Sequence, residues 1–233
     1  MLVSLLGSAT TAAFSVGGGL LLIAVMTALM PAAAVVPVHA PIMVGSNAGR
    51  FLVLRRAVDW PTVGWFAVGA AIGGAAGSQV VLTLPAAALR LCIAGFILFT
   101  QWGPKLDLPL SRRGFVLAGT LSTFLTLFVG ASGPFMTAVL SKIEGYSRVN
   151  LIATGGACMT LQHAAKVAIF FGLGFAYAPW ALLVASCLAS GFVGTLIGTR
   201  VLRSLNEAMF RRALRWLLTA LALYLGVAGL LSL

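Results

Sequence analysis

Apolar runs of about 20 residues recur along the whole chain, and each is long enough to cross the hydrocarbon core of a bilayer as a helix. Hydrophobic residues make up 61% of the 233 positions and charged residues only 8%, which is more apolar surface than a soluble core can bury. The sequence therefore predicts an all-α polytopic membrane protein.

Prolines, glycines and basic clusters divide these runs into eight expected elements. The second element begins with prolines on either side of His39, which is interpreted as a helix-start residue near the outer face. The N-terminal segment lacks a basic stretch before its apolar run and is not expected to be a cleaved signal peptide. The expected elements span residues 1–30, 32–54, 61–83, 86–102, 114–141, 149–174, 178–201 and 209–231.

Two of these elements contain glycine clusters at matching points. Residues 14–26 and 128–140 align at an offset of 114, with identical residues at four positions: Phe14 and Phe128, Gly19 and Gly133, Ala24 and Ala138, Val25 and Val139. Glycine inside a helix costs about 1 kcal/mol relative to alanine. Two clusters at matching points therefore predict two broken helices, at Gly17 to Gly19 and at Gly130 to Pro134.

The match between the two halves extends to the later elements. An offset of 121 superposes Gly73 on Gly194 and Gly77 on Gly198, and such small residues let helices approach closely. We expect an internal duplication, with residues 1–110 as the first membrane repeat and residues 111–233 as the second. The glycine faces offer contacts within one protomer or between protomers, so an oligomer is compatible with the sequence.

The basic residues indicate how the chain crosses the membrane. If all eight elements span it, six basic residues lie on one side and eight on the other, which violates the positive-inside rule. If residues 114–141 instead enter and leave on the same side, Arg90 alone lies opposite and Lys166 falls within a span. The remaining thirteen then share one face: Arg50, Arg55, Arg56, Lys105, Arg112, Arg113, Lys142, Arg148, Arg200, Arg203, Arg211, Arg212 and Arg215.

If the first break behaves like the second, each repeat consists of one re-entrant hairpin and three transmembrane helices. An odd number of crossings makes the two repeats inverted. Inverted repeats with discontinuous helices are typical of secondary transporters, which bind substrate near the midplane. The alternative is a plain bundle of eight spans in which the glycines serve only packing.

Charge and cysteine usage narrow the classes of partner. The net charge of +11 is explained by basic residues in short loops that set orientation and contact lipid, rather than by nucleic acid. The three cysteines stand singly inside apolar segments, so neither a metal site nor a disulfide framework is predicted, and no cofactor is expected. The four acidic residues all fall in connections, which disfavours a carboxylate proton relay or sodium site.

A broken helix in a membrane exposes backbone N–H groups and the positive end of a short dipole, which together attract an anion. Two such N-termini facing each other would form one anion site, and small residues would let an oxyanion touch the backbone. The alternative role for the same residues is tight helix packing. The candidates are Ser15, Gly17, Gly18, Gly19, Gly130, Ser132, Gly133 and Pro134.

Lys166 is predicted to face a cavity, because a lysine at the centre of a membrane helix costs about 2.5 to 3.5 kcal/mol on insertion scales. Gln162 and His163 lie four and three residues earlier, on the same helical face. An offset of 116 pairs Asn47 with His163 and Arg50 with Lys166. We expect Arg50 and Lys166 to supply positive charge to an anion pathway, unless Arg50 is an interfacial anchor. His163 is a candidate for a coupling proton, or a hydrogen-bonded packing residue.

These features together resemble the TauE/SafE family of bacterial anion permeases. The resemblance rests on the duplicated glycine cluster, on His39-Ala40 at the entry to the second span, on Val58-Asp59-Trp60 at the start of the third, and on the paired Gly-x-x-x-Gly stretches. It implies a multi-pass permease of the bacterial inner membrane that exports sulfite, sulfonates such as sulfoacetate, or related organosulfur anions. Ala131-Ser132 replaces further glycines of the family pattern, which leaves the substrate open among small sulfur, carboxylate and inorganic anions.

Two other classes of protein are less compatible with the sequence. An intramembrane enzyme would need a catalytic set, and only Ser132 with His163 as its base is conceivable. A structural subunit would not need a cation in the middle of the membrane. The sequence therefore predicts a transporter and not an enzyme.

Overall fold

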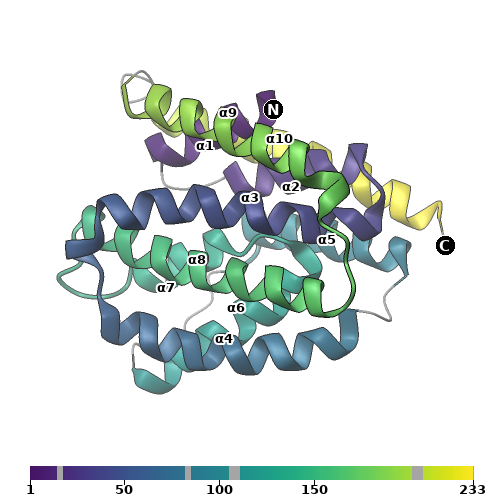
Figure 1. The fold of residues 1–233 in the computed structure, drawn as a ribbon. Helices are drawn as coiled ribbons and strands as arrows, with labels where there is room; N and C mark the ends of the chain where they lie inside the picture. The colour runs from purple at the N-terminus through teal and green to yellow at the C-terminus, as the bar shows by residue number, and fades with distance from the viewer. Residues whose placement is uncertain (15–17, 82–84, 105–110, 201–206, 233) are drawn as a thin grey trace.

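The computed structural model describes residues 1–14, 18–81, 85–104, 111–200 and 207–232 (Figure 1). The described residues form helices and connections without strands, which confirms the predicted all-α class. In chain order the helices are α1 (Leu2–Phe14), α2 (Gly18–Leu29), α3 (Ala32–Val53), η1 (Arg55–Ala57), α4 (Trp60–Val81), α5 (Ala86–Trp102), α6 (Arg112–Val129), α7 (Gly133–Leu140), α8 (Arg148–Gly172), η2 (Ala178–Trp180), α9 (Ala181–Arg200) and α10 (Glu207–Leu230).

Both predicted helix breaks lie at the ends of described helices. In the first half, α1 ends at Phe14 and α2 begins at Gly18, with residues 15–17 outside the described part. In the second half, α6 ends at Val129 and Gly130 adopts a left-handed conformation with φ 83°. A Cβ atom added at Gly130 would also lie 2.5 Å from Cδ1 of Ile23 in α2. Both the backbone conformation and the contact with the first hairpin therefore favour glycine at this position.

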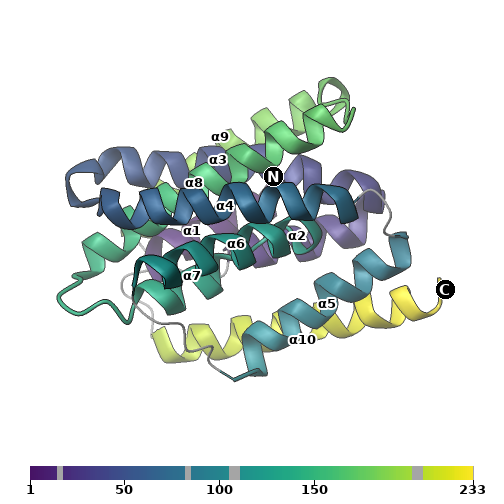
Figure 2. The same cartoon turned by 90° about the horizontal axis from the view of Figure 1, so that it is seen from below.

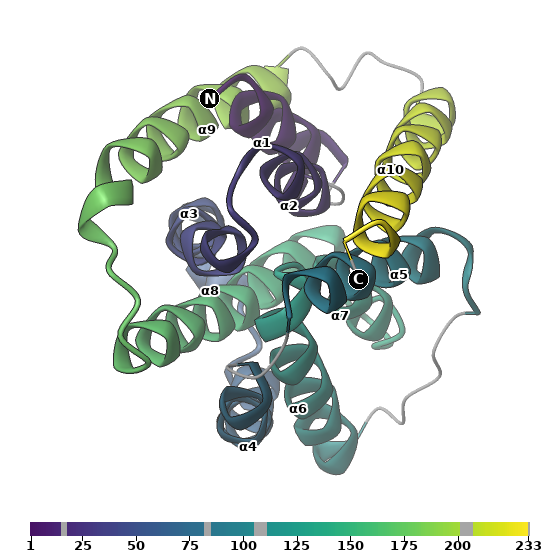
Figure 3. The same ribbon diagram turned by 90° about the vertical axis from the view of Figure 1, so that its right-hand side faces the viewer.

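Four helix pairs make the most extensive contacts: α4 with α6, α1 with α9, α3 with α8, and α5 with α10 (Figure 3). The pair of α5 and α10 forms a layer along one side of the molecule (Figure 2). The counterparts in the two halves are α1 and α6, α2 and α7, α3 and α8, α4 and α9, and α5 and α10. The α4–α6 pair therefore corresponds to the α9–α1 pair, whereas α3–α8 and α5–α10 each join a helix to its own counterpart. Two similar repeats related by a twofold axis would make this set of contacts.

Glycine allows two of these pairs to bring their backbones together. An added Cβ atom at Gly73 of α4 would collide with the carbonyl oxygen of Thr120 in α6. The matching Gly194 of α9 is placed in the same way against the carbonyl oxygen of Leu5 in α1. The small residues that the sequence aligns at an offset of 121 thus hold equivalent contacts, each between a long helix and the first helix of a hairpin.

By length and composition alone, two helices of the described part are candidates for membrane spans, Trp60–Val80 and Ala178–Ile197, and three shorter helices are also apolar. Large apolar side chains of α9 such as Leu182 and Phe192 are 81% and 67% exposed, as expected for a surface that faces lipid. The central helices α3 and α8 are not among the candidates, and both carry buried polar side chains.

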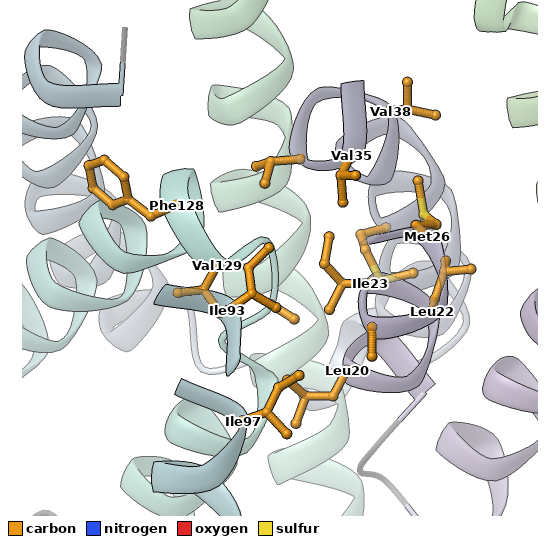
Figure 4. Packing of buried hydrophobic residues seen from close by; sticks show 14 of the residues in the cluster. Leu20, Leu22, Ile23, Met26, Val35, Val38, Ile93, Ile97, Phe128 and Val129 are labelled. Carbon is orange, nitrogen blue, oxygen red and sulfur yellow. The ribbon is translucent and has the colours of Figure 1, made fainter. Parts of the chain in front are cut away.

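The main hydrophobic cluster packs α2 against α5 and against the end of α6 (Figure 4). Leu20 and Ile23 of α2 lie beside Ile93 and Ile97 of α5 and beside Val129 at the end of α6. A second cluster joins α4, α6, α7 and α8 around the second hairpin. The two breaks are therefore fixed from behind by packing, which gives the site between them a defined shape.

A hydrogen-bonded network ties together the connections at one end of the molecule. The carboxylate of Asp59, just before α4, accepts hydrogen bonds from the hydroxyls of Thr62 at 2.8 Å and Tyr146 at 2.6 Å. The backbone N–H of Asp59 donates to the hydroxyl of Thr154 in α8. Burial alone would raise the pKa of the Asp59 carboxyl, but the hydrogen bonds from Tyr146 and Thr62 outweigh it and lower this pKa. Burial and the bond to Asp59 raise the pKa of Tyr146 to about 12.

The Tyr146→Phe substitution is expected to lower the free energy of unfolding by about 1.5 kcal/mol, because it removes a hydrogen bond to a charged group. A carboxyl whose pKa is lowered by folding stabilises the protein above its unfolded pKa, and this contribution disappears as the pH falls through the folded pKa. The difference in the free energy of unfolding between the wild type and Tyr146→Phe, measured in detergent, should therefore be smaller at acidic pH than at neutral pH. Tyr224→Phe on the exposed face of α10 is the control, and equal effects of the two substitutions would contradict the role of Tyr146.

Two basic residues make side-chain contacts that fix their position in the fold. The guanidinium of Arg112, at the start of α6, lies 5.4 Å from the ring centroid of Trp65 near the start of α4. The start of α6 is thus at the same end of the molecule as the network around Asp59. Arg90 instead donates to the hydroxyl of Ser232 near the end of α10. The side of the membrane on which each of these residues lies stays a prediction.

Candidate functional site

A cavity of about 840 Å³ lies where the two helix breaks meet, and α3 and α8 form part of its wall. Eight of the thirteen predicted site residues line it: Gly18, Gly19, Asn47, Arg50, Ser132, Gly133, Pro134 and His163. Gly130, Gln162 and Lys166 are not among its lining residues. Ser15 and Gly17 lie outside the described residues. Most of the described candidates therefore line the cavity, whereas three of them do not.

Two helices begin at the wall of this cavity, one from each break. A Cβ atom added at Gly19, the second residue of α2, would lie 3.9 Å from Cβ of Ala131 in the second break. Ser132 is the N-cap residue of α7, but its side chain makes no capping hydrogen bond. Pro134 in the first turn of α7 has no N–H, and the other N–H groups of this turn are not occupied by the N-cap side chain, so they carry the partial positive charge of a helix N-terminus.

The hydroxyl of Ser132 belongs to a buried polar network behind the wall. Ser132 Oγ lies 2.6 Å from Nε2 of Gln162 and 2.9 Å from Oγ of Ser122, and Ser122 Oγ lies 2.6 Å from Oε1 of Gln162. Among the described residues, the hydrogen bonds of Ser132 go to these two groups and, at 3.9 Å, to the sulfur of Met159. His163 is not one of its partners, so the pair of nucleophile and base considered from the sequence does not form.

Lys166 holds the broken end of α6. Its ammonium donates to the carbonyl oxygen of Gly130 at 2.9 Å and lies 3.5 Å from the carbonyl oxygen and the hydroxyl of Thr126. The last carbonyl groups of a helix have no partner within it and carry partial negative charge, which a cation stabilises. The fully buried Lys166 therefore fixes the second break from behind and places a positive charge close to the cavity.

Arg50 reaches the cavity from α3 and is held there by its neighbour. Its Nη2 donates to Oδ1 of Asn47 at 2.6 Å, and Nδ2 of Asn47 donates to the carbonyl oxygen of Met43 at 2.7 Å. The amide oxygen that would repel an anion is thus engaged by the guanidinium. Arg50 lies three residues before Val53, where α3 ends, so it combines a position near the helix end with a place in the wall.

The structure corrects the interpretation of His39. This residue lies inside α3, which begins at Ala32 and continues through Pro37 and Pro41, and it is fully buried. Prolines mark helix starts in soluble proteins, but a membrane helix tolerates them when its neighbours satisfy the freed carbonyl groups. His39 Nε2 lies 3.2 Å from the carbonyl oxygen of Gly19, so it is assigned as the protonated nitrogen. His39 therefore braces the first break, which the sequence did not reveal.

The rings of His39 and His163 meet edge to face, with their centroids 6.0 Å apart. Nδ1 of each ring is buried and has no hydrogen-bond partner within the described part of the chain. No group of three or more metal-binding side chains comes together among the described residues. The two imidazoles thus connect α3 with α8 directly behind the point where the breaks meet.

Sequence reasoning missed Ser122 and Thr126 as well as His39. Both lie in α6, are fully buried and bond to predicted site residues on α8. The segment Ser122 to Thr126 contains three hydroxyl side chains within an apolar span, and this local enrichment was the available signal. Its interpretation needed the position of α8, because hydroxyl groups in a helix also bond to their own backbone.

One of the comparisons with known proteins identifies a family for this chain. The model of one protein family, described as the sulfite exporter TauE/SafE, matches residues 1–225 of the 233. Neither a curated protein nor a solved structure matches the chain. The family is one of membrane transporters and not of enzymes. Because the match covers almost the whole sequence, the chain belongs to the sulfite exporter TauE/SafE family.

Proposed function

We propose that this protein exports small sulfur oxyanions, namely sulfite or sulfonates such as sulfoacetate, by binding them between its two helix breaks. Membership of the family supplies the class of transporter. The observation that carries the location of the site is the cavity of about 840 Å³ whose wall contains both breaks and Arg50. A bacterial inner membrane is the proposed location.

The wall of the cavity suits an anion because it presents hydrogen-bond donors. The N-terminal ends of α2 and α7 face it with backbone N–H groups, and Arg50 adds a guanidinium that is always charged. Lys166 contributes a second positive charge from behind Gly130. Charged donors in a dry environment bind an oxyanion more strongly than they would in water.

The helix contacts support the proposed arrangement of two inverted repeats, residues 1–110 and 111–233. The exchange of helix pairs between the halves and the equivalent contacts of Gly73 and Gly194 agree with a twofold relation. The cavity reaches Val53 and Leu54 at the end of α3, beside the predicted basic face. This direction favours a conformation open to the cytoplasm, from which an exporter loads its substrate.

Other small anions remain the alternative substrates, because helix N-termini and Arg50 also suit carboxylates and inorganic anions. Coupling to protons is part of the proposal through His163, which lines the cavity. Measuring the efflux of each anion identifies the substrate. Repeating the measurement with and without a pH gradient tests the coupling to protons. A gradient that leaves efflux unchanged would contradict the coupling role of His163.

The Arg50→Ala substitution tests the location of the site. Flux of labelled sulfite and of a short sulfonate into proteoliposomes should be saturable for the wild type, and the KM of the variant should be at least about 10-fold higher, since a charged hydrogen bond is lost. The matched control is Arg56→Ala, six residues later and exposed, which should leave KM unchanged. Equal KM values for the two variants would move the site away from Arg50.

A further inference from the structure

Three buried side chains behind the second break form a closed triangle of hydrogen bonds. Ser122, Ser132 and Gln162 come from α6, the N-cap of α7 and α8, and each is at most 1% exposed. Their three polar contacts measure between 2.6 and 2.9 Å. Of the three residues, only Ser132 lines the cavity. The triangle therefore links one hydroxyl in the wall to two groups that do not line it.

The protons of this triangle can be assigned from its chemistry. The amide oxygen of Gln162 can only accept, so the hydroxyl of Ser122 donates its single proton there. The amide N–H of Gln162 donates to the oxygen of Ser132. The proton of Ser132 is then the one hydroxyl proton in the triangle whose acceptor is not a carbonyl oxygen, because its partners are the hydroxyl of Ser122 and the sulfur of Met159. It can turn to Ser122, to the weakly accepting sulfur of Met159, or toward a ligand in the cavity.

We infer that Gln162 and Ser122 are positioning residues that set the Ser132 hydroxyl as a hydrogen-bond donor to the transported anion. In this orientation of the amide, Gln162 donates to the oxygen of Ser132 and accepts the proton of Ser122. If the amide were turned over, Ser132 would donate to Gln162 and present a lone pair to the cavity, which would repel an anion. This inference rests on the proposed function and adds a selectivity mechanism to it.

A similar arrangement occurs at Asn47, which also lines the cavity. Asn47 donates to the carbonyl oxygen of Met43, and its own amide oxygen is occupied by Arg50. The acceptor atoms of Ser132 and Asn47 are both engaged within the protein, and their free N–H and O–H groups are left for the ligand. Such a wall selects a group whose oxygens carry no protons, as in a sulfonate, over a neutral acid or amide, which would place its own donors against these donors.

The Gln162→Glu substitution tests the inference in proteoliposomes with a labelled short alkyl sulfonate, which stays ionised at every pH used. At about pH 9 the introduced carboxylate can only accept, so the Ser132 proton turns to it and KM should rise at least about 10-fold. At about pH 5 its acid form donates as the amide does, and KM should return toward the wild-type value. Gln162→Met should raise KM equally at both pH values. Thr160→Val is the control on α8, since within the described part of the chain this hydroxyl donates to Gly156 of its own helix.

The outcomes separate the inference from the function on which it rests. The inference is supported if the KM of Gln162→Glu is higher at about pH 9 than at about pH 5, while the KM values of the wild type and of Gln162→Met do not change between these pH values. If the KM of Gln162→Glu equals that of the wild type at about pH 9, the inference is overturned. If its KM rises equally at both pH values, the cause is packing, and the inference is overturned as well. If Gln162→Glu does not fold, Ser122→Ala should raise KM several-fold at unchanged maximal rate, and an unchanged KM would again overturn it. A wild type without saturable sulfonate flux would refute the sulfonate assignment itself.

Discussion

The Gly73→Ala substitution is expected to lower the free energy of unfolding by about 3 kcal/mol, because overpacking at a backbone contact cannot be relieved by rotating a side chain. The added methyl group would meet the carbonyl oxygen of Thr120, so α4 and α6 would have to separate. This pair makes the most extensive helix contact of the described part, and α6 leads directly into the second break. Loss of transport should therefore accompany the loss of stability.

Unfolding by a denaturing detergent measures this effect, and the same helix supplies a control. Gly64 lies in α4 with no atom within 4 Å of an added Cβ. Gly64→Ala should be neutral or stabilising by up to about 1 kcal/mol, since alanine is the better helix former. If both substitutions changed stability by the same amount, the close approach of α4 and α6 would not be the cause. Gly194→Ala in α9 should resemble Gly73→Ala, because its Cβ would meet the carbonyl oxygen of Leu5.

The Lys166→Met substitution is expected to reduce anion flux by about 100-fold, as the loss of a buried charged donor costs up to about 3 kcal/mol. Two effects act in the same direction. The carbonyl oxygen of Gly130 loses its partner at 2.9 Å, which loosens the second break, and the positive charge nearest to that break disappears. Stability should fall much less than flux, because methionine fills the same space without the cost of burying an ammonium group.

Initial rates of labelled anion flux in proteoliposomes, with the amount of folded protein measured in parallel, test the role of Lys166. Arg90→Met removes a positive charge that bonds to Ser232 and does not line the cavity, and it should leave flux unchanged. Flux that survives in Lys166→Met would assign anion binding to the helix N-termini and Arg50 alone. A fall in flux that matches a fall in folded protein would make Lys166 a purely structural residue.

The accuracy of the sequence interpretation differed between residues for physical reasons. The break at Gly130 was predictable because glycine is costly inside a helix and its cluster occurs twice. Lys166 was predicted to face a cavity because a charge in an apolar span needs compensation, but its ammonium is instead compensated behind the wall, by the carbonyl oxygen of Gly130. Its partner was not predictable, because the carbonyl oxygen of Gly130 is 36 residues away in the sequence. His39 was misplaced because Pro37 and Pro41 resemble a helix start when neighbouring helices are unknown.

The sequence by itself determined the helical class, the positions of the two breaks and the family of this protein. These properties follow from hydropathy, glycine content and spacing, which are local along the chain or repeated in it. The tertiary structure alone decided which polar atoms face the cavity and which lie behind it. The packing of α3 on α8 and the return of α6 beside them bring Ser122, Ser132 and Gln162 together, although 30 to 40 residues separate Gln162 from the other two. Hydrogen bonds at such separations depend on helix packing, and no local pattern specifies them.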